Sequence, residues 1–290
     1  MPHPVSRAVL SEHGREFGPY RYVYAVVSRR SQGLSIGINL NPDKSCSFNC
    51  VYCQVERKNT AKKKPVRFPV LMKELHSILD QYLNGCLHSH ERFSSVTDNN
   101  WLSLKDIAIS GDGEATLSPF FNQAVELVLD QTERLKKEHA INVKPVLITN
   151  GSNLGKRNIR SACERLVLGG GEIWVKLDSG NADDFREINQ GSVPFQRFLK
   201  NLFDFGKTCP LILQTLVFSF PDGRLSLNLN DYVLLLQKGI RAGFKPRSIQ
   251  LYTLARKTRL RDLRALSVAG LQAMAEEIRE KTTCCVEVFP

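Results

Sequence analysis

The sequence predicts an α/β fold in which short apolar strands alternate with amphipathic helices. Six apolar segments of strand length recur along the chain, and each is followed by a longer segment with apolar residues at helical spacing. Strand–helix–strand units with right-handed crossovers build a parallel sheet. Six units are two short of a closed (β/α)8 barrel, so we expect an open, six-stranded parallel partial TIM barrel. The alternation alone equally allows a doubly wound sheet.

The expected elements follow one another between residue 34 and the end of the chain. Strands are expected over 34–40, 107–109, 146–148, 173–177, 211–217 and 248–253. Helices are expected over 70–83, 118–137, 156–167, 194–206, 228–242 and 266–282, and a short strand over 286–289 follows the last helix. Ser118-Pro119 suits the N-cap and first position of its helix. Residues 1–33 are expected to form an N-terminal extension and 34–290 one domain.

The composition indicates a globular protein of one large domain or two small ones. Forty Lys and Arg against 29 Asp and Glu give a net charge of +11, which indicates an anionic partner. No run reaches about eighteen apolar residues, and Met1–Leu10 lacks the apolar stretch of a signal peptide, so we expect no membrane partner. Irregularly spaced cysteines without a secretory signal indicate reduced thiols and a cytoplasmic location.

Three cysteines lie within eight residues, Cys46-Ser-Phe-Asn-Cys50-Val-Tyr-Cys53. The turn residues Asn41-Pro42-Asp43 separate them from the first strand, so the thiols lie on a loop at a strand's C-terminal end, where α/β folds place their chemistry. Three thiolates at C-x3-C-x2-C spacing can hold three irons of a [4Fe-4S] cluster and leave the fourth iron open. A structural zinc site needs four ligands, normally in two knuckles, and no second knuckle follows. The spacing favours the cluster, with zinc or three unligated thiols as alternatives.

Polar residues follow three of the other expected strands. After the second strand, the two glycines of Ser110–Glu114 let the backbone approach a ligand, and the carboxylate of Glu114 suits an ammonium group. A structural turn would show the same residues. The third strand ends in Thr149-Asn150, and the fourth in Lys176, Asp178 and Ser179. Polar side chains at this edge indicate ligand contacts, and an ion pair between Lys176 and Asp178 is the alternative.

Other polar and basic residues have less specific patterns. Arg256 lies just past the sixth strand, on the face where a substrate is expected, and suits a phosphate or carboxylate. Gln214 and Gln250 lie inside strands and either line the site or bond backbone groups. Residues 58–69 are expected to form a solvated basic linker, and Cys86-Leu-His88-Ser-His90 a loop rather than a metal site. No role is assigned to Arg29, Arg30, Cys86, Cys284 or Cys285.

The cysteine loop, with the aromatic Tyr52 directly before its third cysteine, resembles that of the radical S-adenosylmethionine (SAM) superfamily. Within that superfamily, longer stretches resemble a group related to the wybutosine (tricyclic guanosine) tRNA-modifying enzymes. These stretches are Ser28–Arg30, Gly37–Lys44, Ile109–Glu114, Leu147–Asn150, Trp174–Asp178 and Leu251–Arg256. Radical SAM enzymes have a partial-barrel fold, so the resemblance supports the open barrel expected above.

The resemblance implies one [4Fe-4S] cluster held by Cys46, Cys50 and Cys53, with SAM bound at the open iron. It implies that an electron from the cluster cleaves SAM to methionine and a 5′-deoxyadenosyl radical, which takes a hydrogen from the substrate. Lys176 and Arg256 are the candidate catalytic residues. The implied SAM contacts are Tyr52, Gly111, Asp112, Gly113, Glu114, Thr149, Asn150, Asp178 and Ser179.

Three functions are compatible with these features. The first is a radical SAM enzyme with one cluster, a small or anionic substrate and an external one-electron donor of the flavodoxin or ferredoxin kind. The second is a radical SAM tRNA-modifying enzyme, which the charge of +11 allows. The wybutosine enzymes carry a second cluster on cysteines ahead of the SAM loop, whereas residues 1–45 contain no cysteine. The third is a basic RNA-binding protein whose cysteine loop holds structural zinc.

Overall fold

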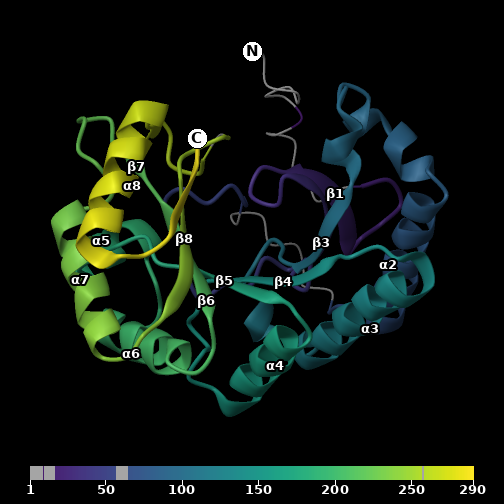
Figure 1. Ribbon diagram of the computed structural model, residues 1–290, viewed down its shortest axis with the longest axis horizontal. Helices are drawn as coiled ribbons and strands as arrows, with labels where there is room; N and C mark the ends of the chain where they lie inside the picture. The colour runs from purple at the N-terminus through teal and green to yellow at the C-terminus, as the bar shows by residue number, and fades with distance from the viewer. Residues whose placement is uncertain (1–8, 10–16, 57–64, 257) are drawn as a thin grey trace. The chain divides into compact units, whose positions relative to one another are not determined.

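The computed structural model describes residues 9, 17–56, 65–256 and 258–290 (Figure 1). The chain divides into two compact units, each made of several segments. The first unit is Met1–Ser45, Thr60–Leu147 and Leu168–Gly171, and the second is Cys46–Asn59, Ile148–Val167 and Glu172–Pro290. Residues 58–64 of the expected basic linker lie outside the described residues.

The strands of the first unit run in the order β1-β2-β3-β4. Their bounds are β1 Val23–Ser28, β2 Gly33–Ile38, β3 Leu104–Ile109 and β4 Lys144–Thr149. β1 and β2 form an antiparallel hairpin, whereas β2, β3 and β4 are parallel. Every residue of β1 and β2 is buried, which explains why both strands are apolar rather than alternating.

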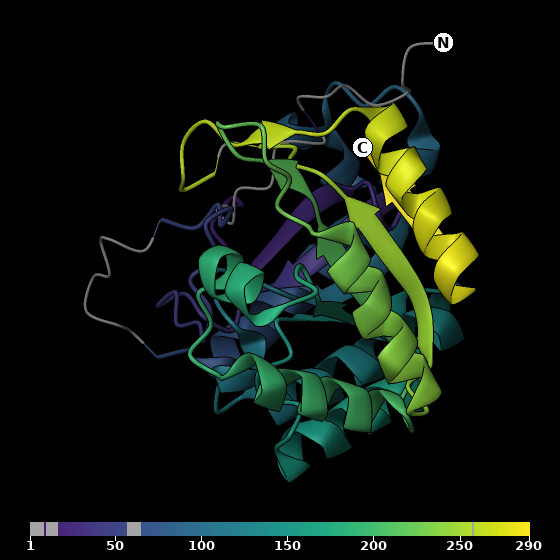
Figure 2. The same ribbon diagram turned by 90° about the vertical axis from the view of Figure 1, so that its left-hand side faces the viewer.

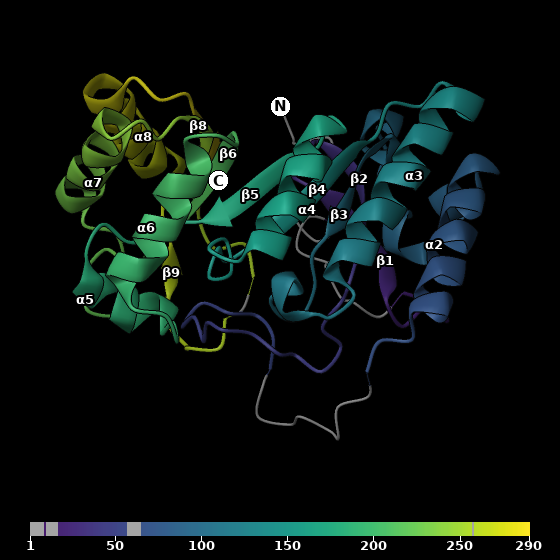
Figure 3. The same cartoon turned by 90° about the horizontal axis from the view of Figure 1, so that it is seen from below.

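Two long helices belong to the first unit, α2 (Phe68–Leu83) and α3 (Phe121–His139), and they lie side by side (Figures 1 and 3). The buried face of α2 includes Leu71, Leu75 and Ile78, which recur at three- and four-residue intervals. α2 packs on β1 and α3 on β3. Three short 3-10 helices between α2 and β3 are η1 Cys86–Ser89, η2 Glu91–Phe93 and η3 Asn99–Leu102. A fourth, η4 (Ala115–Leu117), precedes α3.

The strands of the second unit run in the order β5-β6-β8-β10 and are all parallel. Their bounds are β5 Glu172–Lys176, β6 Leu211–Leu216, β8 Pro246–Tyr252 and β10 Val286–Phe289. The short strands β7 (Phe218–Ser219) and β9 (Arg264–Ala265) pair separately and antiparallel.

The helices of the second unit connect these strands, and α8 packs on α7, β8 and β10 (Figure 2). One of the helical segments, η5, is a π-helix. Their bounds are α4 Arg157–Leu168, α5 Ala182–Asp184, η5 Phe185–Asn189, α6 Phe195–Gly206, α7 Leu229–Arg241 and α8 Val268–Thr282.

The α/β class is confirmed, and β2, β3, β4, β5, β6 and β8 overlap the six expected strands. The count of six is wrong, because the sheet is mixed and also contains β1 and β10. β10 matches the expected terminal strand, whereas β1 lies in the segment that was expected to be an extension. The open-barrel form of the sheet stays a prediction, as does the division at residue 33. Among the described residues, no helix is long and apolar enough to cross a membrane.

Candidate functional site

The π-helix η5 holds one side of the cysteine loop. The backbone N–H of Asn49 donates to the carbonyl of Asn189 at 3.0 Å, and that of Val51 donates to the carbonyl of Ile188 at 2.9 Å. Ile188 and Asn189 are both buried. π-helical turns are rare in proteins, and those that exist often lie at functional sites. The contact between η5 and the cysteine loop is therefore included in the candidate site.

Arg259 also holds the cysteine loop. Its backbone N–H donates to the carbonyl of Cys53 at 2.9 Å. Its guanidinium donates to the side-chain oxygen of Asn49 at 2.7 Å, to the carbonyl of Asn49 at 2.8 Å and to Oε1 of Gln190 at 3.2 Å. Arg259 lies three residues after Arg256, and it holds the cysteine loop from a second segment of the chain.

Two asparagine amides donate to cysteine sulphurs of the loop. Nδ2 of Asn150 lies 3.6 Å from Sγ of Cys46 and 3.0 Å from Oγ of Ser47. Nδ2 of Asn189 lies 3.7 Å from Sγ of Cys50. N–H donors of this kind stabilise negative charge on sulphur, so both amides favour thiolate ligands. Asn150 was expected to contact SAM, and the structure places it against the first cysteine.

The three cysteines of the loop supply thiol groups, which are the ligands of iron–sulphur clusters. Cys46, Cys50 and Cys53 are half-buried. In the described part of the chain, no three His, Cys, Asp or Glu side chains are already gathered as a metal-binding group. Burial, followed by the negative charge of Asp178, raises the pKa of the Cys50 thiol to about 12. A metal that binds Cys50 therefore displaces a proton.

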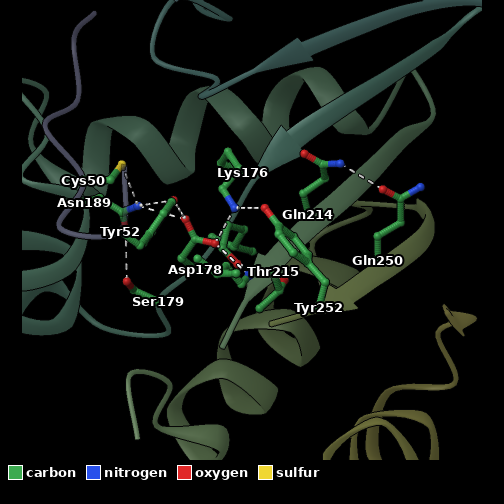
Figure 4. A network of polar contacts seen from close by, with 12 residues as sticks. Cys50, Tyr52, Lys176, Asp178, Ser179, Asn189, Gln214, Thr215, Gln250 and Tyr252 are labelled. Atoms are coloured by element: carbon green, nitrogen blue, oxygen red, sulfur yellow. Dashed lines mark hydrogen bonds and ion pairs between the residues drawn. The ribbon is translucent and has the colours of Figure 1, made fainter. Parts of the chain in front are cut away.

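The carboxylate of Asp178 lies at the end of β5 and accepts four hydrogen bonds (Figure 4). Oδ1 is 2.8 Å from Nζ of Lys176 and 2.9 Å from the N–H of Leu216. Oδ2 is 2.5 Å from the hydroxyl of Tyr52 and 2.9 Å from Nδ2 of Asn189. A carboxylate offers about four lone-pair sites, so these partners fill it. A ribose hydroxyl would have to displace one of them, and the expected contact between Asp178 and SAM stays a prediction.

Lys176 lies between two tyrosines and is paired with Asp178, as the alternative interpretation foresaw. Its Nζ lies 5.1 Å from the ring centre of Tyr52 and 4.7 Å from that of Tyr252, and it donates to the Tyr252 hydroxyl at 2.5 Å. Burial pulls its pKa down, but Asp178 and Tyr252 outweigh burial and leave the pKa of Lys176 raised. Lys176 is therefore an ammonium at neutral pH.

Burial and the charge of Asp178 also act on Tyr52. Together they hold the pKa of Tyr52 well above its ordinary value. The phenol is therefore a hydrogen-bond donor across the physiological pH range. Because Tyr52 directly precedes Cys53, this donor ties the cysteine loop to the end of β5.

Lys176, Gln214 and Gln250 form a row across β5, β6 and β8, because the strand register places them opposite one another. Nε2 of Gln214 donates to Oε1 of Gln250 at 2.9 Å, so the two glutamines pair with each other rather than with the backbone. Within the described residues, Oε1 of Gln214 is buried and accepts no hydrogen bond. A buried acceptor without a donor is costly in a protein interior, so Gln214 suits a ligand or water that donates to it.

Two further expected SAM contacts are buried in local hydrogen bonds. Ser179 is fully buried and donates to Oδ1 of Asn189 at 3.2 Å. Oγ1 of Thr149 accepts from the N–H of Gly151 at 3.1 Å, which shapes the turn after β4. Their contacts with SAM stay predictions. Arg256 donates to Oε1 of Gln54, the residue after Cys53, at 2.7 Å, so this candidate catalytic residue lies beside the cysteine loop.

The glycine motif of the first unit packs on the residue that precedes Cys46. The N–H of Glu114 donates to the carbonyl of Ser45 at 2.9 Å. A Cβ on Gly113 would lie 2.0 Å from that same carbonyl oxygen, and one on Gly111 would lie 2.2 Å from Oδ1 of Asn39. Both positions therefore require glycine for close approach, as the sequence indicated.

The two acidic side chains of this motif are engaged within the first unit. Asn39 donates through Nδ2 to Oδ2 of Asp112 at 2.6 Å. Glu114 is 2% exposed, and its Oε1 accepts from the N–H of Thr116 at 3.2 Å and from its hydroxyl at 2.6 Å. Glu114 thus caps the helix η4, and its contact with the amino group of SAM stays a prediction.

Three residues of the site were missed by reasoning from the sequence. Tyr252 ends the sixth strand at the same edge as Lys176, so its position alone was a sufficient signal. Arg259 is one of several basic residues after the sixth strand, of which only Arg256 was assigned a role. Asn189 gave no signal, because it lies in a polar stretch where nothing marks one amide as buried.

No protein-family model matches the sequence. Among curated proteins, the chain is similar to a GTPase Obg of Brachyspira hyodysenteriae, 25% identical over 277 residues that cover 94% of this chain and 34% of that protein. It is 30% identical to a UPF0026 protein of Methanocaldococcus jannaschii over 174 residues, 60% of this chain and 43% of that protein. The chain thus spans 34% of the length of the first relative and 43% of the length of the second. It contains no G-x4-G-K-S/T phosphate loop.

Two solved structures share the fold. One is TYW1 with a lysine–pyruvate adduct bound, with a TM-score of 0.56, 18% identity and coverage of 86% of this chain and 74% of that chain. The other is HydG, a maturase of the [FeFe]-hydrogenase, with a TM-score of 0.52, 11% identity and coverage of 87% of this chain and 50% of that chain. At these identities, the likeness to the two structures shows that the fold is shared.

Proposed function

We propose that this chain is a radical SAM enzyme that holds one [4Fe-4S] cluster on Cys46, Cys50 and Cys53 and cleaves SAM reductively. The observation that carries the proposal is the cysteine loop itself, which is held by backbone hydrogen bonds to η5 and to Arg259 and has amide donors on two of its sulphurs. When bound, the cluster supplies the electron that splits SAM into methionine and the 5′-deoxyadenosyl radical.

The substrate is a small or anionic molecule that takes its place beside Lys176. An ammonium has three N–H donors, and Lys176 directs two of them to Asp178 and Tyr252, which leaves one for a carboxylate or phosphate oxygen. The buried oxygen of Gln214 adds an acceptor for a hydroxyl or amine on the same face of the sheet. Arg256 supplies a second cation next to the cysteine loop.

Lys176 acts as a charged anchor rather than as an amine nucleophile. A lysine that attacks a carbonyl must first lose its proton, and the raised pKa of Lys176 opposes that loss. TYW1 was solved with a lysine–pyruvate adduct. A covalent adduct on Nζ of Lys176 would require the ion pair between Lys176 and Asp178 to break. We therefore assign Lys176 to substrate binding.

The proposed SAM contacts are those expected from the sequence. Tyr52 and Asn150 are proposed because both touch the cysteine loop, the first by its position and the second through Cys46. Gly111, Asp112, Gly113 and Glu114 are proposed because their loop packs on Ser45, the residue before Cys46. Thr149, Asp178 and Ser179 are retained for the ribose, and Asp178 also holds Lys176 in place. The electron comes from an external one-electron donor.

A tRNA substrate is the second candidate function. The observation that favours it is the net charge of +11, because a basic protein attracts the phosphates of a nucleic acid. It predicts tRNA binding that weakens steeply as salt increases, whereas a small substrate predicts no such binding. If the three cysteines bind zinc, both radical SAM functions are excluded and an RNA-binding protein with structural zinc is favoured.

Counting iron and sulphide in protein purified without oxygen tests the proposal. We expect about four of each per chain and their loss when Cys46, Cys50 and Cys53 are all replaced by Ala. About eight irons would indicate a second cluster and favour the tRNA function. Zinc in place of iron would exclude the proposed enzyme.

A further inference from the structure

Asn189 directs one amide group at both the cysteine loop and the buried ion pair (Figure 4). Its Nδ2 lies 2.9 Å from Oδ2 of Asp178, 3.7 Å from Sγ of Cys50 and 3.5 Å from the hydroxyl of Tyr52. The residue is 1% exposed, so water does not compete for these contacts. Its backbone carbonyl accepts from Asn49 in the same loop.

The orientation of the amide is fixed by its surroundings. Oδ1 accepts from the hydroxyl of Ser179, which is fully buried. A flipped amide would face the carboxylate of Asp178 with its oxygen, and two acceptors would then oppose each other without a proton. The nitrogen therefore faces Asp178 and Cys50, and its two protons serve a carboxylate and a sulphur at once.

We infer that Asn189 is a positioning residue that sets the reduction potential of the proposed cluster through Cys50. The inference rests on the proposed cluster. An N–H donor stabilises negative charge on a ligating sulphur, and a reduced cluster carries one more negative charge than an oxidised one. The amide therefore favours the reduced state, and Asp178 and Ser179 keep it aimed at the sulphur.

The test is a redox titration of the reconstituted protein, followed by electron paramagnetic resonance without SAM. Asn189→Leu keeps the side-chain shape but removes the donor. We expect the ratio of reduced to oxidised cluster at a fixed potential to fall about tenfold, which is about 59 mV for one electron. Ile188→Val, in the same π-helix, removes one buried methylene and no polar contact, and we expect its ratio to change less than twofold.

A second variant covers the case in which Asn189→Leu fails to take up iron. Ser179→Ala leaves the amide in place but removes the hydroxyl that orients it, and we expect a shift in the same direction and about threefold in size. An Asn189→Leu potential equal to that of Ile188→Val overturns the inference. An unchanged potential in Ser179→Ala, when the leucine variant binds no cluster, also overturns it.

The inference and the proposed function fail in different ways. A wild-type protein that takes up no iron and sulphide contradicts the proposed function, and the inference falls with it. A wild-type protein that holds a cluster and cleaves SAM, while Asn189→Leu titrates at the wild-type potential, contradicts the inference alone.

Discussion

The hydroxyl of Tyr52 donates to the carboxylate of Asp178 at 2.5 Å, so the residue before Cys53 is bonded to a group at the end of β5. The same carboxylate pairs with Lys176 at 2.8 Å. One buried charge thus connects the loop that carries the proposed cluster to the lysine that is proposed to bind substrate. A substitution of Tyr52 or of Lys176 is therefore expected to affect both the cysteine loop and the substrate-binding lysine.

Tyr52→Phe removes the hydroxyl but keeps the ring, which packs 6.1 Å from the ring of Phe218. Hydrogen bonds to charged groups contribute about 1.5–3 kcal/mol, so we expect a loss of that size in the free energy of unfolding, measured with urea on metal-free protein. Tyr20→Phe is the control, because in the described part of the chain its hydroxyl bonds to the neutral side chains of Ser77 and Gln81. Equal losses in the two variants would show that the bond to Asp178 contributes no more to the free energy of unfolding than hydrogen bonds to neutral groups do.

Lys176→Met leaves the carboxylate of Asp178 buried without its cation. Removing one partner of a buried ion pair costs about 3–5 kcal/mol, and we expect that loss at neutral pH. Because the folded-state pKa of Lys176 is raised, its contribution is fully present below the ordinary lysine pKa of about 10.4 and is lost only as the pH rises through the folded value.

Urea unfolding at three pH values measures this dependence. The stability difference between wild type and Lys176→Met is expected to be the same at about pH 7 and pH 9 and smaller at about pH 11. Tyr52 contributes in the same direction in both proteins, because its pKa is also raised. A difference that grows between pH 7 and pH 9 would mean that the folded-state pKa of Lys176 is lowered rather than raised, because the unfolded chain would then bind more protons than the folded one.

Gly113→Ala forces a methyl group against the carbonyl oxygen of Ser45, 2.0 Å away. Because the obstacle is backbone, it cannot rotate aside, and we expect a loss of at least about 1–3 kcal/mol in thermal or urea unfolding. Gly270→Ala in α8 is the control, since its new Cβ would lie 3.3 Å from Oγ of Ser267 and alanine favours a helix by about 0.5–1 kcal/mol. A Gly113→Ala variant as stable as the wild type would contradict the close approach of the glycine motif to Ser45.

Arg259→Ala removes the guanidinium that bonds to Asn49 and Gln190. The residue is exposed, so we expect little change in global stability but a several-fold faster loss of iron to a chelator, because the cysteine loop loses one of its two supports. Arg261→Ala, at an exposed residue two positions further on, should release iron at the wild-type rate. Equal rates in the two variants would show that Arg259 does not support the loop.

The repeated strands were predictable because each is a short apolar run that precedes an amphipathic helix. β1 was missed although Val23, Val26 and Val27 give it a β-branched, apolar run of strand length. The polar residues around Val23–Ser28 led to its assignment to an extension. Gln32, at φ 53°, lies in the turn before β2 and carries none of the glycine or asparagine signals that mark hairpins.

The cysteine loop was predictable because its chemistry is encoded in spacing. Its supports were not, because they come from residues more than one hundred positions away whose types are ordinary in loops. Asn189 ends the π-helix η5 and Gln190 follows it, and no sequence signal marks this π-helix, whose Ile188 belongs to a buried apolar cluster. The pairing of Lys176 with Asp178 was foreseen, but the filling of the carboxylate by Tyr52 and Asn189 requires the fold.

Formation of 5′-deoxyadenosine tests the central claim most directly. The protein is purified without oxygen, reconstituted with iron and sulphide, and mixed with SAM and a strong one-electron reductant. We predict that the wild type produces 5′-deoxyadenosine and methionine in equal amounts and that the variant with Cys46, Cys50 and Cys53 replaced by Ala produces neither. Intact SAM in the presence of a fully assembled, reducible cluster would contradict the assignment of this chain as a radical SAM enzyme.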